Sequence, residues 1–191
     1  MRIINSIFTT RCVHTCTTLL REKPNNLKGS WSQVAVKLTN ADCKQDGPTG
    51  RVIAIDRYPI SPIEGATVLG NIDFTALDTH RKVYQLLNET KANVVLSDMA
   101  PNATGIRELD HENIMKLAYC AMKFALQVLQ KDGLFLVKIW DGPNLIRLQN
   151  DLGKFYTNIK RFKPNATRSE SSETFVLASG FKGLKISSPN V

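Results

Sequence analysis

Three aspartates stand at positions where layered α/β proteins commonly bind ligands. Asp56, Asp73 and Asp98 each come at or just after the end of a short apolar run. Such runs, bounded by turn-forming residues, are typical of buried parallel strands. Ligands of open α/β sheets bind beyond the carboxyl ends of the strands, and an acid after the second strand commonly binds a ribose diol. One aspartate alone would more often close a turn, but three in series predict a cofactor pocket.

Lys138 interrupts the apolar segment 133–140. A lysine is almost never buried unless it is paired, because taking its ammonium group out of water is costly. The alternative is a lysine near the exposed end of a strand, with its amine reaching water. Since the segment 133–140 is the next predicted strand after the one that precedes Asp98, we favour a functional lysine with Asp98 as its chemical partner.

The intervening segments predict one layered α/β domain. Apolar runs predict strands at 50–56, 66–71, 94–97, 133–140, 157–162 and 173–178. Apolar residues at helical spacing predict helices at 30–38, 79–89, 108–130 and 144–155. Ser30 or Ser32 can cap the first of these helices, and Gly133 can end the third. The order predicts a mainly parallel sheet that closes with an antiparallel hairpin.

Composition narrows the class of protein. The chain has 191 residues, enough for one domain with a real core, and a net charge of +8. This balance is typical of proteins that bind nucleic acid, although a merely basic mitochondrial or ribosome-associated protein would share it. A cluster in the last predicted loop suits phosphate contacts or simple solvation: Lys160, Arg161, Lys163 and Arg168. The four cysteines lack metal-binding spacing, which predicts reduced thiols and no metal.

The two ends of the chain differ from the middle. Residues 1–21 are rich in Arg, Ser and Thr and contain no acid, which is typical of a mitochondrial leader. A tail without function is the alternative. Residues 22–28 are a polar linker, so residues 1–28 together form the predicted leader and linker. The domain is expected over 29–182 and a polar tail over 183–191. No apolar run reaches the roughly 20 residues that a membrane span needs.

Five segments together resemble one known family. They are GSWSQVAV at 29–36, Ile55-Asp56, SDMAPNATG at 97–105 with LDHEN at 109–113, FLVK at 135–138, and KPNATRSESSETFVLA at 163–178. With these segments the chain resembles the FtsJ (RrmJ) family of ribosomal RNA 2′-O-ribose methyltransferases. The likeness is strongest to the mitochondrial branch, which modifies a uridine of the large-subunit rRNA.

The resemblance implies a Rossmann-like methyltransferase fold, S-adenosyl-L-methionine as cofactor, and rRNA of the large ribosomal subunit as substrate and partner. The protein is expected to act as a monomer. The implied cofactor-binding residues are Gly29 and Trp31 at the end of the glycine-rich loop, Asp56 on the cofactor ribose, Asp73 near the adenine amino group, and Asp98 near the methionine part.

The resemblance also implies a catalytic set: Lys138, Asp98 and Glu173. A ribose 2′-hydroxyl must lose its proton as it attacks a sulfonium methyl group. Lys138 can act as base if desolvation or a neighbouring cation lowers its pKa; if it stays charged, it can orient the hydroxyl and stabilise the anion. Asp98 and Glu173 would hold the lysine, and the scheme requires no metal.

One part of the family pattern is missing from this chain. The family has a second lysine in an N-terminal helix and a central strand ending in Gly-Ala-Ala-Pro-Gly, expected beside the strand 94–97. Here the segment 25–29 follows the leader-like residues directly, so we expect a domain that is incomplete at its N-terminal end. The alternative function is therefore a catalytically inactive relative that binds RNA or assists ribosome assembly. A nicotinamide-dependent oxidoreductase is disfavoured because the sequence has no G-x-G-x-x-G.

Overall fold

A computed structural model describes the backbone of residues 34–39 and the whole of residues 50–63, 66–163 and 172–184, except that for Gly50 only the backbone is described. The elements of this part follow one another as β1 (Val34–Thr39), β2 (Gly50–Ile55), β3 (Ala66–Leu69), α2 (Leu77–Leu87), β4 (Ala92–Ser97), α3 (Arg107–Val128), β5 (Leu129–Trp140), α4 (Leu145–Phe155), β6 (Tyr156–Phe162) and β7 (Glu173–Phe181).

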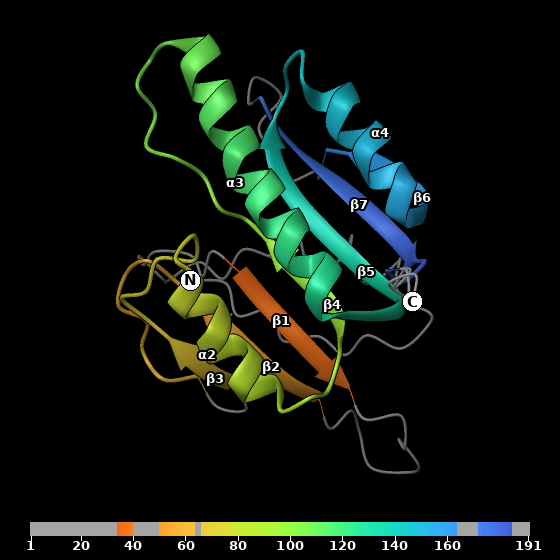
Figure 1. The fold of residues 1–191 in the computed structure, drawn as a ribbon. Helices are drawn as coiled ribbons and strands as arrows, with labels where there is room; N and C mark the ends of the chain where they lie inside the picture. Colours follow the sequence, from red (N-terminus) through yellow and green to blue (C-terminus); the bar gives the residue numbers. More distant parts are fainter. Residues whose placement is uncertain (1–33, 40–49, 64–65, 164–171, 185–191) are drawn as a thin grey trace, which may run out of the picture.

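The described strands form a single mixed sheet in the order β3-β2-β1-β4-β5-β7-β6 (Figure 1). The pairs β2–β3 and β4–β5 are parallel. Strand β1 is antiparallel to both β2 and β4, and β7 is antiparallel to both β5 and β6. It follows that β2 to β6 all run in one direction, as the sequence predicts. The antiparallel C-terminal hairpin β6–β7 is also confirmed.

The helix predicted at 30–38 is wrong for the part that the structure describes. Residues Val34–Thr39 form strand β1, paired on one side with β2 and on the other with β4. The sequence VAVKLT alternates branched apolar residues with others, and this period of two suits a strand between two neighbours. Strand β1 therefore occupies the place beside β4 where the family pattern expects its central strand, and it runs in the opposite direction.

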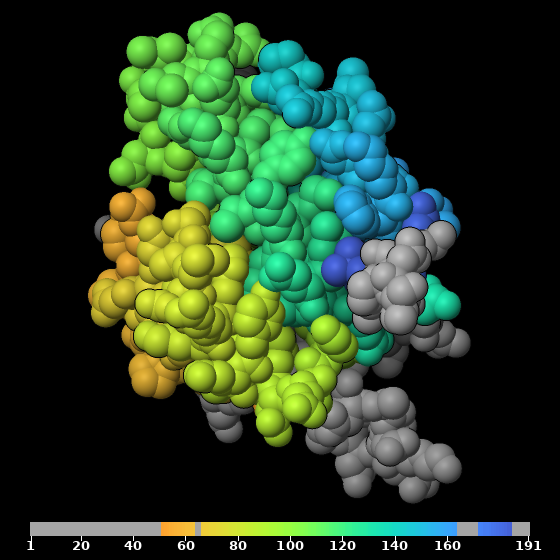
Figure 2. Space-filling view, in the orientation of Figure 1, coloured from red at the N-terminus to blue at the C-terminus, as the bar shows by residue number. Residues whose placement is uncertain are grey.

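The three described helices lie on one face of the sheet (Figure 1), and their atoms cover much of that face in the space-filling view (Figure 2). The core lies between the two layers. Alternate strand residues such as Ile53, Val95 and Phe135 point into this core and are inaccessible to solvent. Residues of the opposite parity form a second, smaller cluster on the other face: Leu136, Phe175 and Leu177, with Leu96 and Phe162 packed against them. Among the described residues, no helix is long and apolar enough to cross a membrane.

The end of α3 differs from the predicted one. The helix stops at Val128, and Leu129 is already extended and paired with Ala92 of β4. The left-handed residue is Asp132, with φ 64°, and not Gly133. The backbone at Gly133 is instead closely packed against its neighbours, because a Cβ there would lie 2.8 Å from the Gln130 carbonyl oxygen.

The antiparallel placement of β1 predicts a set of disulfide cross-links. With the native cysteines replaced by serine, the cysteine pairs A35C/L96C and K37C/V94C should both oxidise readily, because each joins Cα partners in the register. The pair K37C/L96C, two residues out of register, is the matched control and should not. Mass spectrometry after mild oxidation gives the yields; cross-linking of only one in-register pair would contradict the antiparallel register.

Candidate active site

The directions of the strands bring the predicted residues to one edge of the sheet. Strands β2, β4 and β5 all end there, and β7, which runs the other way, begins there. Asp56 and Asp98 follow β2 and β4 directly, while Lys138 lies near the end of β5. Glu173 opens β7 and pairs in register with Trp140. Side chains that are distant in sequence are thus collected by topology.

Lys138 and Glu173 form an ion pair across β5 and β7. The Lys138 Nζ atom lies 3.9 Å from Glu173 Oε2, and the two side chains are 16% and 34% exposed. By strand alternation both point to the face opposite the helices, next to Leu136 and Phe175. The lysine is therefore largely buried but held close to the edge, with the Glu173 carboxylate beside it.

Opposing electrostatic effects act on the pKa of the Asp98 carboxyl group. Burial raises the pKa of Asp98 to about 6, against the nearby Lys138 ammonium, which lowers it. The negative charges of Asp56 and Glu173 push the pKa of Asp98 further upward. Its Oδ1 atom is buried and has no hydrogen-bond partner within the described part of the chain. Asp98 thus lies within electrostatic range of Lys138, Asp56 and Glu173.

Asp56 is fully buried at the end of β2. Its Oδ1 accepts a hydrogen bond of 2.8 Å from the backbone N–H of Tyr58. Burial raises the pKa of Asp56, opposed by the backbone N–H groups of Tyr58 and Arg57. The second oxygen, Oδ2, is buried and finds no partner among the described residues. A buried acceptor of this kind is costly in a folded protein, so it marks a place where a ligand donor can bind.

Asp73 lies in a separate part of the edge. It lines an open cavity of about 330 Å³ with Arg57 and Thr75, and residues 99–102 of the loop after β4 and residues of α3 line the cavity as well. The backbone N–H and hydroxyl of Thr75 each donate to Asp73 Oδ1 at 2.8 Å, and they lower the pKa of Asp73. The cavity lining does not include Asp56, Asp98, Lys138 or Glu173. The site therefore has two adjoining parts, joined by the loop that begins at Asp98.

Some predicted residues stand apart from this geometry. Gly29, Trp31 and Arg168 lie outside the described residues. Arg161, predicted as a phosphate contact, already has partners within the chain, although it is exposed: its Nη2 lies 2.7 Å from Asp141 Oδ2 and its Nε donates to Thr174 Oγ1 at 3.2 Å.

Other residues at this edge were not predicted from the sequence. Asn113 and Lys116 line the cavity from α3, and Arg57 does so from the loop after β2. Asp110 and His111, in the first turns of α3, bind the loops that border the site. The signal for Asp110 and His111 was their place inside the segment LDHEN, which we used for the resemblance and not for the site.

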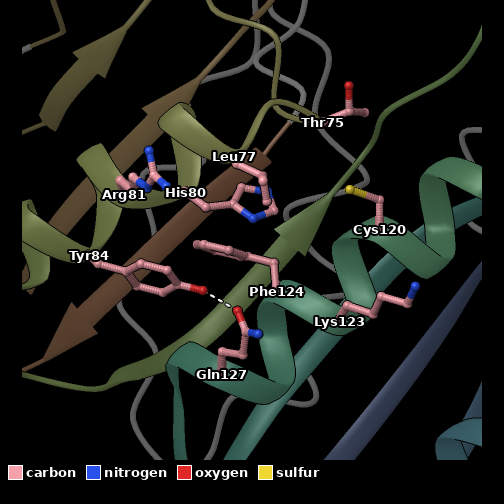
Figure 3. Close-up of a pocket in the computed structure, with 9 residues that line it drawn as sticks. All are labelled: Thr75, Leu77, His80, Arg81, Tyr84, Cys120, Lys123, Phe124 and Gln127. Atoms are coloured by element: carbon pink, nitrogen blue, oxygen red, sulfur yellow. Dashed lines mark hydrogen bonds between the residues drawn. The ribbon is translucent and has the colours of Figure 1, made fainter.

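A second cavity, of about 450 Å³, lies in the groove between α2 and α3 (Figure 3). His80 and Phe124 lie side by side in it, with ring centroids 4.9 Å apart, and the Tyr84 hydroxyl donates to the Gln127 side chain. Thr75 lines both cavities. This groove contains none of the residues predicted for the site.

The fold and site define an α/β domain of the class that binds ligands beyond the carboxyl ends of its strands. More narrowly, the chain belongs to the FtsJ-like methyltransferase family, whose model matches residues 26–181. This confirms the family inferred from the motifs.

Curated proteins of similar sequence are in agreement with this family, since they are named rRNA methyltransferases. The chain is 44% identical over 156 residues to the mitochondrial rRNA methyltransferase 2 of Drosophila melanogaster, covering 81% of this chain and 62% of that protein. It is 40% identical over 158 residues to the ribosomal RNA large subunit methyltransferase E of Parvibaculum lavamentivorans, covering 81% and 61%. The chain thus spans about three fifths of the length of these relatives. A crystal structure of a ribosomal RNA methyltransferase from Plasmodium falciparum shares the fold, with TM-score 0.58 and 23% identity over 69% of this chain and 72% of that one.

The raised pKa of Asp98 predicts how its replacement changes stability. A carboxyl whose folded pKa lies above its ordinary value of 3.8 destabilises the fold at neutral pH, and this cost is relieved as the pH falls through about 6. We expect Asp98→Asn to increase the free energy of unfolding at pH 7 by roughly 2–3 kcal/mol, and to have little effect at pH 4. Urea denaturation at both pH values measures this.

Asp110→Asn is the matched control for that experiment. The pKa of Asp110 is lowered by its hydrogen bonds with Thr104, so the same substitution there should decrease stability at pH 7. A loss of stability in Asp98→Asn would contradict the strained carboxylate.

Proposed function

We propose that this chain carries the site of an S-adenosyl-L-methionine-dependent rRNA methyltransferase, which methylates a ribose 2′-hydroxyl of the large-subunit rRNA. The observation that carries the proposal is the grouping of Asp98 with Lys138 and Glu173 at the carboxyl edge. Family membership and the names of the relatives support it. The uridine target and the domain over 29–182 are part of the same proposal.

The chemistry of the described residues fits the proposed cofactor. S-adenosyl-L-methionine has a ribose diol and an adenine amine, which donate hydrogen bonds, and a sulfonium and an ammonium group, which are positive. Three carboxylates at the edge can accept these hydrogen bonds and balance these positive charges. Asp56 and Asp98 each have a buried oxygen that lacks a partner in the described part of the chain. Asp73 lines the 330 Å³ cavity. When bound, the cofactor would supply an electrophilic methyl group. Asp56, Asp73 and Asp98, with Gly29 and Trp31, are the residues we assign to hold it.

Lys138 is the residue we assign to the proton of the attacking hydroxyl. Its amine is mostly shielded from water and bordered by Glu173 and Asp98. As a neutral amine it accepts the proton directly; as an ammonium group it orients the ribose oxygen and stabilises the negative charge that develops there, while the proton leaves to water. Asp98 and Glu173 fix the amine in place in either case.

RNA is the proposed substrate because the chain is strongly basic, with a net charge of +8. Lys160 on the edge strand β6 is exposed and suits a phosphate contact. We place the protein in mitochondria because of the leader predicted at residues 1–21 and the mitochondrial name of the Drosophila relative. The monomeric state expected from the sequence stays a prediction.

Cofactor binding gives the first test of this function. Isothermal titration of the chain with S-adenosyl-L-methionine should show binding, and Asp56→Asn should weaken it by about tenfold or more, because one charge-assisted hydrogen bond is worth roughly 1.5–3 kcal/mol. Asp78→Asn, an exposed acid of α2 that pairs with Arg81, is the control and should bind as the parent does. Equal affinity in Asp56→Asn and the parent would remove Asp56 from the site.

Methyl transfer gives the second test. With tritiated cofactor and unmethylated large-subunit rRNA, Lys138→Met should lose roughly 10²–10⁴-fold in rate, the usual size of a general acid–base or orienting contribution. Lys82→Met, on the exposed side of α2, should keep the parent rate. If the parent chain binds RNA and never methylates it, the inactive RNA-binding alternative is correct.

A further inference from the structure

Two neighbouring residues of α3 are buried although both are polar. Asp110 is 9% exposed and His111 is 5% exposed. Successive side chains of a helix point about 100° apart, so adjacent residues reach different neighbours. Polar groups buried at this level are normally retained only where they make specific hydrogen bonds.

Asp110 binds the end of the loop that begins at Asp98. Its Oδ1 accepts hydrogen bonds of 2.7 Å from both the backbone N–H and the hydroxyl of Thr104, and its Oδ2 accepts from the Gly105 N–H at 3.1 Å. Ile106, the N-cap of α3, makes no side-chain cap hydrogen bond, and Asp110 instead holds the two residues before it, Thr104 and Gly105. Gly105 has φ 84°, which fixes a sharp turn there. The loop 98–105 is thus tied at its far end, while its middle, 99–102, lines the 330 Å³ cavity.

His111 binds a different loop, the one after β5. Its Nε2 accepts a hydrogen bond of 3.2 Å from the backbone N–H of Asn144. Gly142 packs directly against the His111 imidazole ring. A Cβ at this position would be 2.4 Å from the ring atoms Cε1 and Nδ1, so no larger residue fits unless the ring moves.

The same loop is tied to the chain before Glu173. The Asp141 N–H donates to the Ser172 carbonyl oxygen at 2.7 Å, and the Asp141 carboxylate pairs with Arg161. The loop 141–144 follows β5, the strand that carries Lys138. Its hydrogen bond to Ser172 ties it to the start of β7, the strand that begins with Glu173.

We infer that Asp110 and His111 form a two-loop clamp that positions the two halves of the site separately. Asp110 positions the loop 98–105, which borders the cavity proposed for the cofactor. His111 positions the loop 141–144, and with it the Lys138–Glu173 pair. The inference rests on the proposed function and deepens it, because it assigns cofactor affinity to one residue and the rate of transfer to its neighbour.

The clamp predicts a division between two measured quantities. Asp110→Ala should raise the dissociation constant of S-adenosyl-L-methionine by about tenfold or more, because three hydrogen bonds of the loop are lost. His111→Leu should leave this constant within about twofold and lower kcat by about tenfold or more. His111→Gln, whose side-chain oxygen can accept from Asn144, should recover most of kcat. A merely structural role would instead move both quantities in both variants, and that result would overturn the clamp. A lower melting temperature alone does not decide, because the loss of the Asp110 hydrogen bonds is expected to decrease stability.

Gly142 supplies an independent check on the His111 half. Gly142→Ala should lower kcat because its methyl group meets the imidazole ring. In the double variant with His111→Ala the ring is absent, so the two losses should be clearly less than additive. Additive losses would show that the contact of ring and glycine does not position the loop.

Hydrogen exchange tests the Asp110 half without reference to any activity. In the folded protein the Thr104 and Gly105 amide protons should exchange at least tenfold faster in Asp110→Ala than in the parent, while amides of β7 remain as protected. Unchanged exchange would refute the clamp. Faster exchange in a protein that transfers no methyl group would leave the clamp standing and refute the proposed function instead.

Discussion

The burial of a carboxylate beside a lysine is the constraint on which the site depends. Asp98 is held where its charged form is disfavoured, and the Lys138 ammonium offsets only part of that cost. Two further carboxylates, Asp56 and Glu173, add repulsion. Since a domain has only about 5–15 kcal/mol of net stability, the surrounding sheet and helices must provide enough packing to hold this arrangement. The large core between the sheet and the three described helices meets that need.

The two strands that run against their neighbours, β1 and β7, allow this grouping of charged residues in different ways. Strand β7 runs against β5 and therefore begins where β5 ends, which brings Glu173 to Lys138. Strand β1 runs against β2 and β4 and satisfies the backbone hydrogen bonds of both. Without a strand in that place, the two strands that carry Asp56 and Asp98 would each present an open edge. Their separation, and with it the repulsion between the two acids, is set by the width of this one strand.

Much of the site could be predicted because its signals are local. An acid directly after an apolar run indicates the end of a buried strand, and Asp56 and Asp98 follow this rule. The strand β1 could not be predicted with the same rule, since VAVKLT suits a helix or a strand until its two neighbours are known. Arg161 was predicted to contact phosphate because its partner Asp141 lies 20 positions earlier and cannot be recognised in the sequence. Asp110 was not predicted because its partners include backbone N–H groups. Such contacts depend on tertiary structure and leave no periodic pattern in the sequence.

The position of β7 also has a consequence for how the protein is made. It is the last of the described elements in the chain, yet it lies inside the sheet, between β5 and β6. While the chain is still being synthesised, β5 and β6 have no strand between them, and Lys138 has not yet met Glu173. Contacts over such sequence separations form late, since the entropy of closing the loop must be overcome first. The pair is therefore completed only after the preceding strands have left the ribosome, so the nascent protein is unlike the finished one at the very residues proposed for catalysis.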